Sequence, residues 1–299
     1  MSVVVLAYHE MGCLGLRVLL GRGVKVSAVF TYEDDPSENI WFRSVAELAR
    51  EKGIPTLTTK EINHPKWVEY IRSLKPEVIF SFYYRDIIKR PVREIPRYGC
   101  VNLHGSLLPK YRGRSPINWQ LVHGEMESGV TLHYIVGRAD AGDIIGQARV
   151  PVGPDDTAIV LYRKLLPAAE GLLSRHLQGI LTGTAPRIPQ DDSQATTFGG
   201  RRPEDGRIEW TRPAREIHNL VRAVAPPWPG AFSDRPGGRV MVFCAKLHGC
   251  LPNAPRLAPG EVRIDQGRVM VGSGDGLLEL IEYTTPAGKP LISGEVLGW

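Results

Sequence analysis

Three polar side chains in this sequence have the chemistry needed to move an acyl group onto an amine. Asn102 and His104 close the run Gly99-Cys-Val-Asn-Leu-His, and Asp140 lies in Gly137-Arg-Ala-Asp-Ala-Gly-Asp. An amide can donate to a carbonyl oxygen, an imidazole can shuttle a proton near neutral pH, and a carboxylate can hold the imidazole in one tautomer. We therefore predict Asn102, His104 and Asp140 as catalytic residues.

The run that contains Asn102 reads as the end of a buried strand. With period-two alternation, Asn102 and His104 leave one face while Val101 and Leu103 leave the other. Burying unpaired polar groups is costly, so this pair needs partners. On these two residues alone, a structural pair that satisfies a strand end is an equal alternative to a catalytic pair.

Composition is that of a globular protein, with 299 residues, 42% hydrophobic, 23% charged and a net charge of +5. The apolar runs are far too short to span a bilayer, and no secretion signal is visible. Lys and Arg are scattered, which gives no support for nucleic-acid binding. Cys244, His248 and Cys250 lack a fourth ligand and a usual zinc spacing. We expect a reduced cytoplasmic protein without a metal or membrane insertion.

The first two-thirds of the chain alternates strand and helix patterns. Apolar runs predict the strands 2–7, 24–30, 78–82, 100–104, 130–136 and 144–150. Apolar periodicity and capping residues predict the helices 12–20, 44–52, 63–74, 115–122 and 156–181, with Ser44, Asn63 and Asp156 as N-caps. Strands separated by helices imply right-handed crossovers. The predicted fold class is therefore α/β, with a doubly wound, mostly parallel, Rossmann-like sheet.

The last third has a different character. Pro and Gly lie among short polar residues at 185–205, which is typical of a linker or surface segment. A helix near 213–225 and strands near 239–247, 260–264, 268–272 and 277–283 follow it. We predict a small OB-like antiparallel barrel with one helix. The expected boundaries are 1–189 for the catalytic domain, 190–205 for the linker and 206–299 for the barrel.

At the segments around the three polar residues, the sequence resembles the 10-formyltetrahydrofolate-dependent formyltransferases over nearly its whole length. Asn102, His104 and Asp140 fall where that family has its catalytic trio, and Ser106-Leu-Leu-Pro is its most recognisable loop. With the loop in register, the purely structural reading of Asn102 and His104 becomes a minor one. The resemblance implies formyl transfer from 10-formyltetrahydrofolate, with Asn102 donating to the formyl oxygen.

Five segments narrow the resemblance to the formyltransferase portion of bifunctional enzymes that formylate UDP-4-amino-4-deoxy-L-arabinose in lipid A modification and polymyxin resistance. They are 7–15, 80–85, 104–114, 138–142 and 221–231. This similarity implies a UDP-amino sugar as the acceptor. It also implies fusion to, or association with, a decarboxylase domain.

The resemblance also implies binding residues for the two substrates. Those expected to contact 10-formyltetrahydrofolate are Asp86, Ile87, Ile88, Arg114, Val136, Gly137, Arg138 and Ala139. Arg201 and Arg202 are our candidates for the pyrophosphate of the sugar nucleotide, because guanidinium forks pair with phosphate oxygens. An exposed Arg pair is more often plain surface. No metal is required, because a neutral amine is already a nucleophile.

Other functions within and outside this chemistry remain as alternatives. A methionyl-tRNA formyltransferase would carry a longer, basic insertion where Thr31–Trp41 is short and acidic, which disfavours RNA phosphate. A formyltransferase for another amino-sugar nucleotide shares every motif. A formyltetrahydrofolate hydrolase would have an N-terminal regulatory domain that this sequence lacks. A silent folate- or sugar-nucleotide-binding module does not need the intact trio.

Overall fold

The computed structural model describes residues 2–36, 38–248 and 257–298. The chain divides into two compact units. The N-terminal unit comprises 1–116, 127–151 and 163–198, and the C-terminal unit comprises 117–126, 152–162 and 199–299. The domain and linker boundaries expected from the sequence stay predictions.

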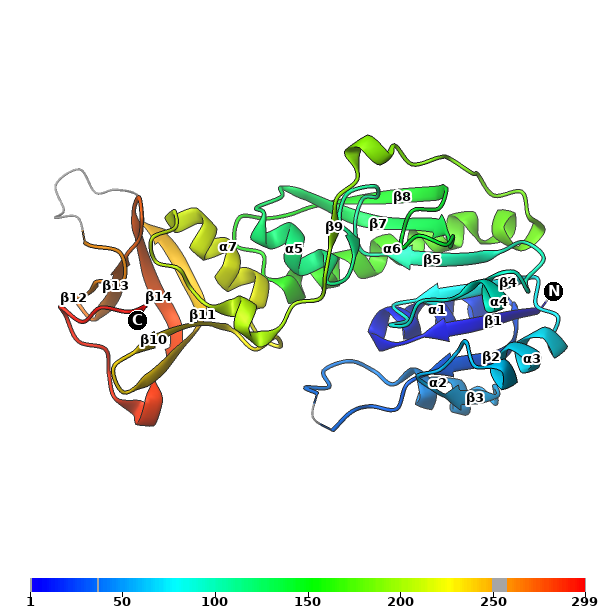
Figure 1. Cartoon of the computed structure of the whole chain (residues 1–299), viewed down its shortest axis with the longest axis horizontal. Helices are drawn as coiled ribbons and strands as arrows, with labels where there is room; N and C mark the ends of the chain where they lie inside the picture. The colour runs from blue at the N-terminus through cyan, green and yellow to red at the C-terminus, as the bar shows by residue number, and fades with distance from the viewer. Residues whose placement is uncertain (1, 37, 249–256, 299) are drawn as a thin grey trace. The chain divides into compact units, whose positions relative to one another are not determined.

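The N-terminal unit contains a seven-stranded sheet in the order β3-β2-β1-β4-β5-β7-β8 (Figure 1). The strands are β1 (Ser2–Ala7), β2 (Lys25–Thr31), β3 (Thr56–Thr58), β4 (Val78–Phe82), β5 (Cys100–His104), β7 (Glu127–Tyr134) and β8 (Ile144–Pro151). The first five run parallel, whereas β7 is antiparallel to β5 and β8 to β7. The predicted mostly parallel α/β sheet is confirmed, and β3 is a strand that the sequence did not reveal.

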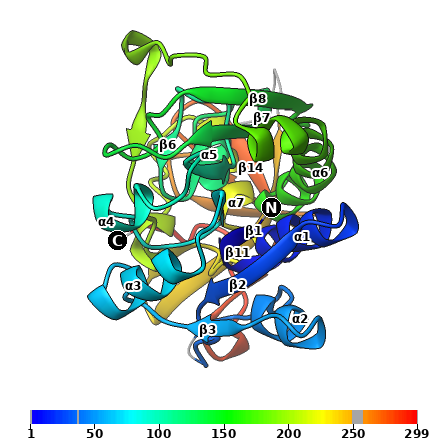
Figure 2. The same ribbon diagram turned by 90° about the vertical axis from the view of Figure 1, so that its right-hand side faces the viewer.

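Helices cover both faces of this sheet (Figure 2). One face carries α1 (His9–Gly21), α2 (Val45–Glu51) and α6 (Ala158–Thr182), and the other carries α3 (Pro65–Ser73) and α4 (Arg90–Arg93). Apolar residues of α3 and α4 pack against β1, β2 and β4 in one core cluster. On the opposite face, a Cβ built on Gly15 would lie 2.4 Å from the Phe82 ring, so glycine lets α1 pack close to β4.

Two of the three predicted helix caps differ in the structure. Ser44 caps α2 as expected, with Oγ accepting from the Glu47 N–H at 3.3 Å. His64, not Asn63, caps α3, because its Nδ1 accepts from the Lys66 N–H. The Asn63 side chain instead binds the backbone of Ile87 and Lys89. Asp156 lies two residues before α6 and accepts from the Gly153 N–H at 2.6 Å.

The C-terminal unit contains a five-stranded antiparallel sheet in the order β10-β11-β14-β13-β12. Its strands are β10 (Ala231–Arg235), β11 (Gly238–His248), β12 (Val262–Asp265), β13 (Arg268–Gly272) and β14 (Leu277–Thr284). Helix α7 (Ala214–Val224) packs its apolar face onto this sheet, and α5 (Pro116–Val122) lies almost entirely in the same unit. Strand β10 was not predicted.

Residues 295–298 hydrogen-bond to both edges of the C-terminal sheet. Beside β12, the Leu297 N–H donates to the Gly260 carbonyl at 2.8 Å, and the Val262 N–H donates to the Glu295 carbonyl at 2.8 Å. At the other edge, the Gly298 N–H donates to Asp234 of β10 at 2.9 Å. The segment therefore links the two edge strands, which fits the barrel-like domain expected from the sequence.

A second, much shorter sheet lies in the N-terminal unit. It pairs β6 (Arg112–Gly113) with β9 (Thr197–Phe198) in parallel. Short 3₁₀ helices occupy 192–194, 203–206 and 286–288. Among the described residues, every helix is too short or too polar to cross a bilayer.

Candidate active site

Strand β5 carries two of the predicted catalytic residues on one face. Val101 and Leu103 are buried on the other face, as the alternation predicts. In the antiparallel pairing of β5 with β7, Asn102 lies opposite His133, and His104 lies opposite Thr131. Strand pairing therefore places a second histidine beside Asn102.

The structure brings Asn102, His104 and Asp140 together. Asp140 Oδ2 lies 3.7 Å from His104 Nδ1, and Asp140 Oδ1 lies 3.4 Å from the amide nitrogen of Asn102. The same Oδ1 lies 3.4 Å from His133 Nε2. His104 and His133 are buried, at 6% and 1% exposure, so these polar contacts form largely out of water.

Backbone carbonyls assign the protons on both imidazoles, since a carbonyl oxygen can only accept. His104 Nε2 lies 2.7 Å from the Tyr111 carbonyl and therefore carries the proton, which leaves the Nδ1 lone pair facing Asp140. His133 Nδ1 lies 2.9 Å from the Tyr134 carbonyl, so its Nε2 accepts from the Asn102 amide at 3.1 Å. One N–H of Asn102 is thus used by His133, and the other makes only the longer contact to Asp140.

The Asp140 carboxyl is held as an anion. Burial raises its pKa, but the imidazoles of His104 and His133, when protonated, and the hydrogen bond from the Gly113 N–H outweigh burial, and the pKa falls well below the usual range. The Gly113 N–H donates to Oδ2 at 2.8 Å. Asp140 itself has a φ of +50°, a left-handed backbone conformation that residues other than glycine rarely adopt. Such strain is typical of functional sites.

The Ser106–Pro109 loop is fixed by a side chain of the neighbouring strand. Thr131 donates to the Ser106 carbonyl at 2.6 Å and accepts from the Leu108 N–H at 3.1 Å. Gln147 donates to the Leu108 carbonyl at 2.8 Å. The loop that the sequence singled out is therefore anchored to the same strand that carries His133.

The residues expected to contact the folate lie in the N-terminal unit, in two loops. Tyr32 holds the first loop, because its hydroxyl accepts from the Asp86 N–H and donates to the Asp86 carboxylate at 3.0 Å. Arg114 reaches this loop by donating to the Arg85 carbonyl at 3.3 Å. In the second loop, Val136, Gly137, Arg138 and Ala139 are exposed and lead directly into Asp140.

Arg201 and Arg202 belong to the C-terminal unit, and both residues form contacts with other groups of the protein. The Arg201 guanidinium lies 4.6 Å from the centre of the Trp119 ring and donates to the Asp205 carbonyl at 2.7 Å. The Arg201 Nε is buried without a hydrogen-bond partner. The Arg202 N–H donates to the Asp205 carboxylate at 2.6 Å, and its side chain is exposed. Their predicted role at a pyrophosphate stays a prediction.

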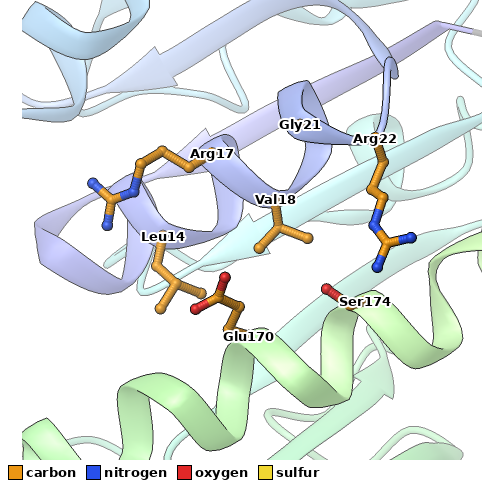
Figure 3. Close-up of a pocket in the computed structure, with 7 residues that line it drawn as sticks. All are labelled: Leu14, Arg17, Val18, Gly21, Arg22, Glu170 and Ser174. Carbon is orange, nitrogen blue, oxygen red and sulfur yellow. The ribbon is translucent and has the colours of Figure 1, made fainter.

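A cavity of about 310 Å³ lies between α1 and α6 (Figure 3). It is lined by Leu14, Arg17, Val18, Gly21, Arg22, Glu170 and Ser174. None of these is a predicted site residue, so the candidate site is defined by the convergence of side chains around Asp140. Across residues 2–36, 38–248 and 257–298, no group of three or more His, Cys, Asp and Glu side chains is placed to hold a metal ion.

Sequence reasoning identified three members of this site and missed most of their partners. His133 lies in the predicted strand 130–136, but its partner depends on the register of β5 against β7, which the sequence does not show. The Gly113 N–H and the Tyr111 carbonyl are backbone groups, for which the sequence carries no direct signal. Thr131 and His133 alternate with apolar residues in a buried strand, and this pattern could have indicated that both side chains face the site.

Family models match both units of the chain. The model described as "Formyl transferase" matches residues 18–177, and "Formyl transferase, C-terminal domain" matches residues 201–297. The chain belongs to the formyl transferase family. It is therefore an enzyme of folate-dependent formyl transfer, in agreement with the resemblance found at the trio and its loop.

Solved structures of similar fold include several formyltransferases. An N-formyltransferase from Helicobacter canadensis, in complex with folinic acid and dTDP-3-aminofucose, is 23% identical, with 94% of this chain and 98% of that chain covered and a TM-score of 0.74. A sugar N-formyltransferase from a Shewanella species is 18% identical, with 83% and 98% covered and a TM-score of 0.65. HypX from Aquifex aeolicus, in complex with tetrahydrofolic acid, is 20% identical, with 95% and 44% covered and a TM-score of 0.63. At these identities the likeness shows a shared fold.

Proposed function

We propose that this formyl transferase moves the formyl group of 10-formyltetrahydrofolate onto the 4-amino group of UDP-4-amino-4-deoxy-L-arabinose. The convergence of Asn102, His104 and Asp140 carries the formyl-transfer part of the proposal. The five sequence segments that resemble the polymyxin-resistance enzymes support this acceptor, and with it a role in lipid A modification in the cytoplasm. The solved structures of the same fold support the acceptor class, because one is bound to dTDP-3-aminofucose and another is a sugar N-formyltransferase.

In this proposal His104 takes a proton through Nδ1. Its Nε2–H is committed to the Tyr111 carbonyl, so Nδ1 is the nitrogen available to the amine. When Nδ1 gains the proton, the Asp140 carboxylate 3.7 Å away stabilises the imidazolium. The same proton then passes to the folate nitrogen that leaves. A positioned base of this kind contributes about 10²–10⁴-fold to rate.

Asn102 supports the charge that develops on the formyl oxygen. One of its N–H groups is held by His133 at 3.1 Å, which fixes the plane of the amide. The second makes only the 3.4 Å contact to Asp140, and in the proposal it donates to the formyl oxygen instead. Loss of one such donor costs about 3–4 kcal/mol of transition-state stabilisation.

The two loops near the trio offer the groups that a reduced folate needs. The co-substrate supplies an activated formyl group, an apolar ring system and an acidic tail. Ile87 and Val136 expose 71% and 41% of their surface, which is unusual for aliphatic side chains and leaves them available to a ring. The Arg114 guanidinium donates to the Arg85 carbonyl and so brings a cation to the loop that carries Ile87. These residues fit the co-substrate that the family uses.

The segment from Glu33 to Glu38 argues against RNA as the acceptor. Its acidic side chains are exposed, and Glu38 forms a two-pronged ion pair with Arg85, at 2.7 and 2.8 Å. Tyr8 donates to Asp34, and Thr58 donates to Glu33. The Arg85 pair neutralises Glu38, so the repulsion of a phosphate backbone comes from the exposed carboxylates of Glu33, Asp34 and Asp35.

Incubation with 10-formyltetrahydrofolate and a panel of acceptors tests the proposal. The panel contains UDP-4-amino-4-deoxy-L-arabinose, other UDP- and dTDP-amino sugars, and methionyl initiator tRNA. We expect formylation of the UDP-arabinose derivative with the highest kcat/KM. A higher kcat/KM for another amino sugar would change the acceptor, and formylation of the tRNA at a comparable rate would replace the proposed function.

A further inference from the structure

The segment from Ile188 to Phe198 contacts every loop that carries a catalytic residue or its backbone partner. Ile188 pairs with Ile144 through two backbone hydrogen bonds, at 2.8 and 3.0 Å. Thr196 accepts from the Arg112 N–H through its carbonyl and from the Tyr111 N–H through its hydroxyl, both at 2.8 Å. The Phe198 ring stacks on Tyr111 at 5.2 Å. All of these residues belong to the N-terminal unit.

Within this segment, the side chain of Gln190 grips the turn that contains Asp140. Its amide nitrogen donates to the Asp140 carbonyl and to the Gly142 carbonyl, each at 2.7 Å. Both N–H groups of Gln190 are therefore spent on a turn whose Asp140 has a φ of +50°. A strained conformation persists only where surrounding contacts over-determine it, and these two hydrogen bonds supply that restraint.

Arg112 fixes the other end of Gln190. Its guanidinium donates to Gln190 Oε1 through Nε at 3.1 Å and through Nη2 at 2.7 Å. Nη2 also donates to Asp192 Oδ1 at 2.8 Å, and Arg138 pairs with the second oxygen of Asp192. The Arg112 side chain is only 5% exposed, so it is a buried charge with defined partners.

This network connects His104 with Asp140 through residues 111–113. The residue after Arg112, Gly113, donates to Asp140 Oδ2, and the residue before it, Tyr111, accepts from His104 Nε2. Gln190 thus connects the backbone of Asp140 to the Arg112 side chain. The residues on either side of Arg112 hold the Asp140 carboxylate and the His104 ring. Loss of the Gln190 donors frees the backbone of this turn and leaves Asp140 held through its side chain alone.

We propose that Gln190, held by Arg112, is a positioning residue that fixes the Asp140 carboxylate against His104. It touches neither substrate and acts through the backbone of the turn. The proposal rests on the proposed formyl transfer, in which the Asp140 carboxylate stabilises the protonated imidazole. Without the grip of Gln190, the carboxylate withdraws from Nδ1.

The variant Gln190→Glu tests this role with little change in size. Glutamate keeps an oxygen for Arg112 and removes both N–H donors to the turn. We expect kcat to fall about 10²-fold, the loss typical of a misplacement near 1 Å. The Kd of the UDP-amino sugar stays unchanged.

Arg235 in the C-terminal unit provides a matched control for Arg112. Its side chain is 6% exposed, and it donates to the Lys289 carbonyl at 2.8 Å and pairs with Glu295 at 2.9 Å. Arg112→Lys and Arg235→Lys are both expected to lower stability. Only Arg112→Lys is expected to lower kcat. Equal kcat values for the two variants would reduce Arg112 to a structural role and overturn the proposal.

A crystal structure of Gln190→Glu separates this inference from the proposed function. We expect the distance from Asp140 Oδ2 to His104 Nδ1 to exceed the 3.7 Å of the native chain. An unchanged distance would overturn the inference, as would a native kcat. If the native enzyme formylates no acceptor, the proposed function fails, and this distance still decides the inference. Gln190→Met, which lacks the donors and any charge, replaces Gln190→Glu if that variant does not fold.

Discussion

The loops around the candidate site and the turns of the C-terminal sheet reverse the chain with different residues. Near the site, most left-handed positions are residues with side chains, namely His9, Tyr83, Tyr111, Ser115 and Asp140, with Gly113 as an exception. In the C-terminal sheet, most such positions in the described residues are glycines, including Gly230, Gly237, Gly260 and Gly267, with Gln266 as an exception. Glycine adopts this conformation without strain, whereas other residues lose about 1 kcal/mol or more. The comparison teaches that strain is tolerated where a side chain is needed at the turn.

Both regions also contain histidine–carboxylate pairs, and replacing one histidine in each region tests the comparison most directly. His104→Ala is expected to lower kcat by about 10²–10⁴-fold, because the proposed base is lost, with the affinity for the sugar nucleotide nearly unchanged. His248, whose Nε2 lies 2.6 Å from Glu279, is the matched control, and His248→Ala should leave kcat unchanged. Steady-state kinetics with the UDP-amino sugar measures both. Unaltered turnover in His104→Ala would remove His104 from the mechanism.

Adding a methyl group to one glycine in each region sharpens the comparison. Gly267→Ala has a φ of +78° and no atom within 4 Å of the new Cβ, so only backbone strain of about 1–2 kcal/mol is expected. In Gly113→Ala, φ is +96° and the Cβ would lie 2.2 Å from the Phe198 carbonyl oxygen, so strands β6 and β9 must separate. Urea denaturation should show the larger loss of unfolding free energy for Gly113→Ala, together with lower turnover. Equal losses would contradict the distinction.

His9, one of the left-handed residues of the site region, is expected to make stability depend on pH. Burial, with the charge of Arg85, lowers the pKa of His9 to about 3. The unfolded chain therefore takes up this proton first as the pH falls through about 6.5, and the native state loses on the order of 3 kcal/mol by pH 4. The carboxylate of Asp140 has a lowered pKa, so its contribution is lost only below about pH 4.

His9→Asn should flatten this dependence, since asparagine tolerates the left-handed φ of +68° and does not titrate. Unfolding free energies measured by urea at pH 7 and pH 4 give the difference. A variant that loses as much stability as the native chain between these pH values would show that His9 is not the cause.

The smallest change in stability is expected for a glycine that lies inside a helix. Gly171 lies inside α6, is exposed, and has no atom within 4 Å of a built Cβ. Gly171→Ala should raise stability by about 0.5–1 kcal/mol, because alanine loses less conformational freedom in a helix. Thermal unfolding is expected to shift upward by about 2 °C. A downward shift would contradict this reading of the helix.

The sequence predicted those parts of the molecule that depend on local patterns. The strands 2–7, 78–82, 100–104 and 268–272 match their observed bounds, because each is a short apolar run between clear breaks. Strand β10 escaped prediction because Ser233, Asp234 and Arg235 follow its two apolar residues. Its pairing with β11, rather than its own pattern, makes it a strand.

For the site, the three predicted catalytic residues meet as expected, whereas their supporting partners required the fold. His133 depends on the register of two antiparallel strands, and Gln190 lies 50 residues from the turn that it holds. The polar segment that contains Gln190 resembled a linker, since composition reports solvent preference and carries no information on long-range hydrogen bonds. The roles of the folate and pyrophosphate residues remain predictions for the acceptor and variant experiments.

The attachment of residues 295–298 to both edges of the C-terminal sheet has a practical consequence. Their hydrogen bonds to Gly260 and Asp234 occupy backbone groups that an edge strand would otherwise offer to another molecule. Truncation of this segment would leave unpaired backbone groups at both edges of the sheet and would favour edge-to-edge aggregation. Expression trials that trim the carboxyl end should therefore keep residues 295–298.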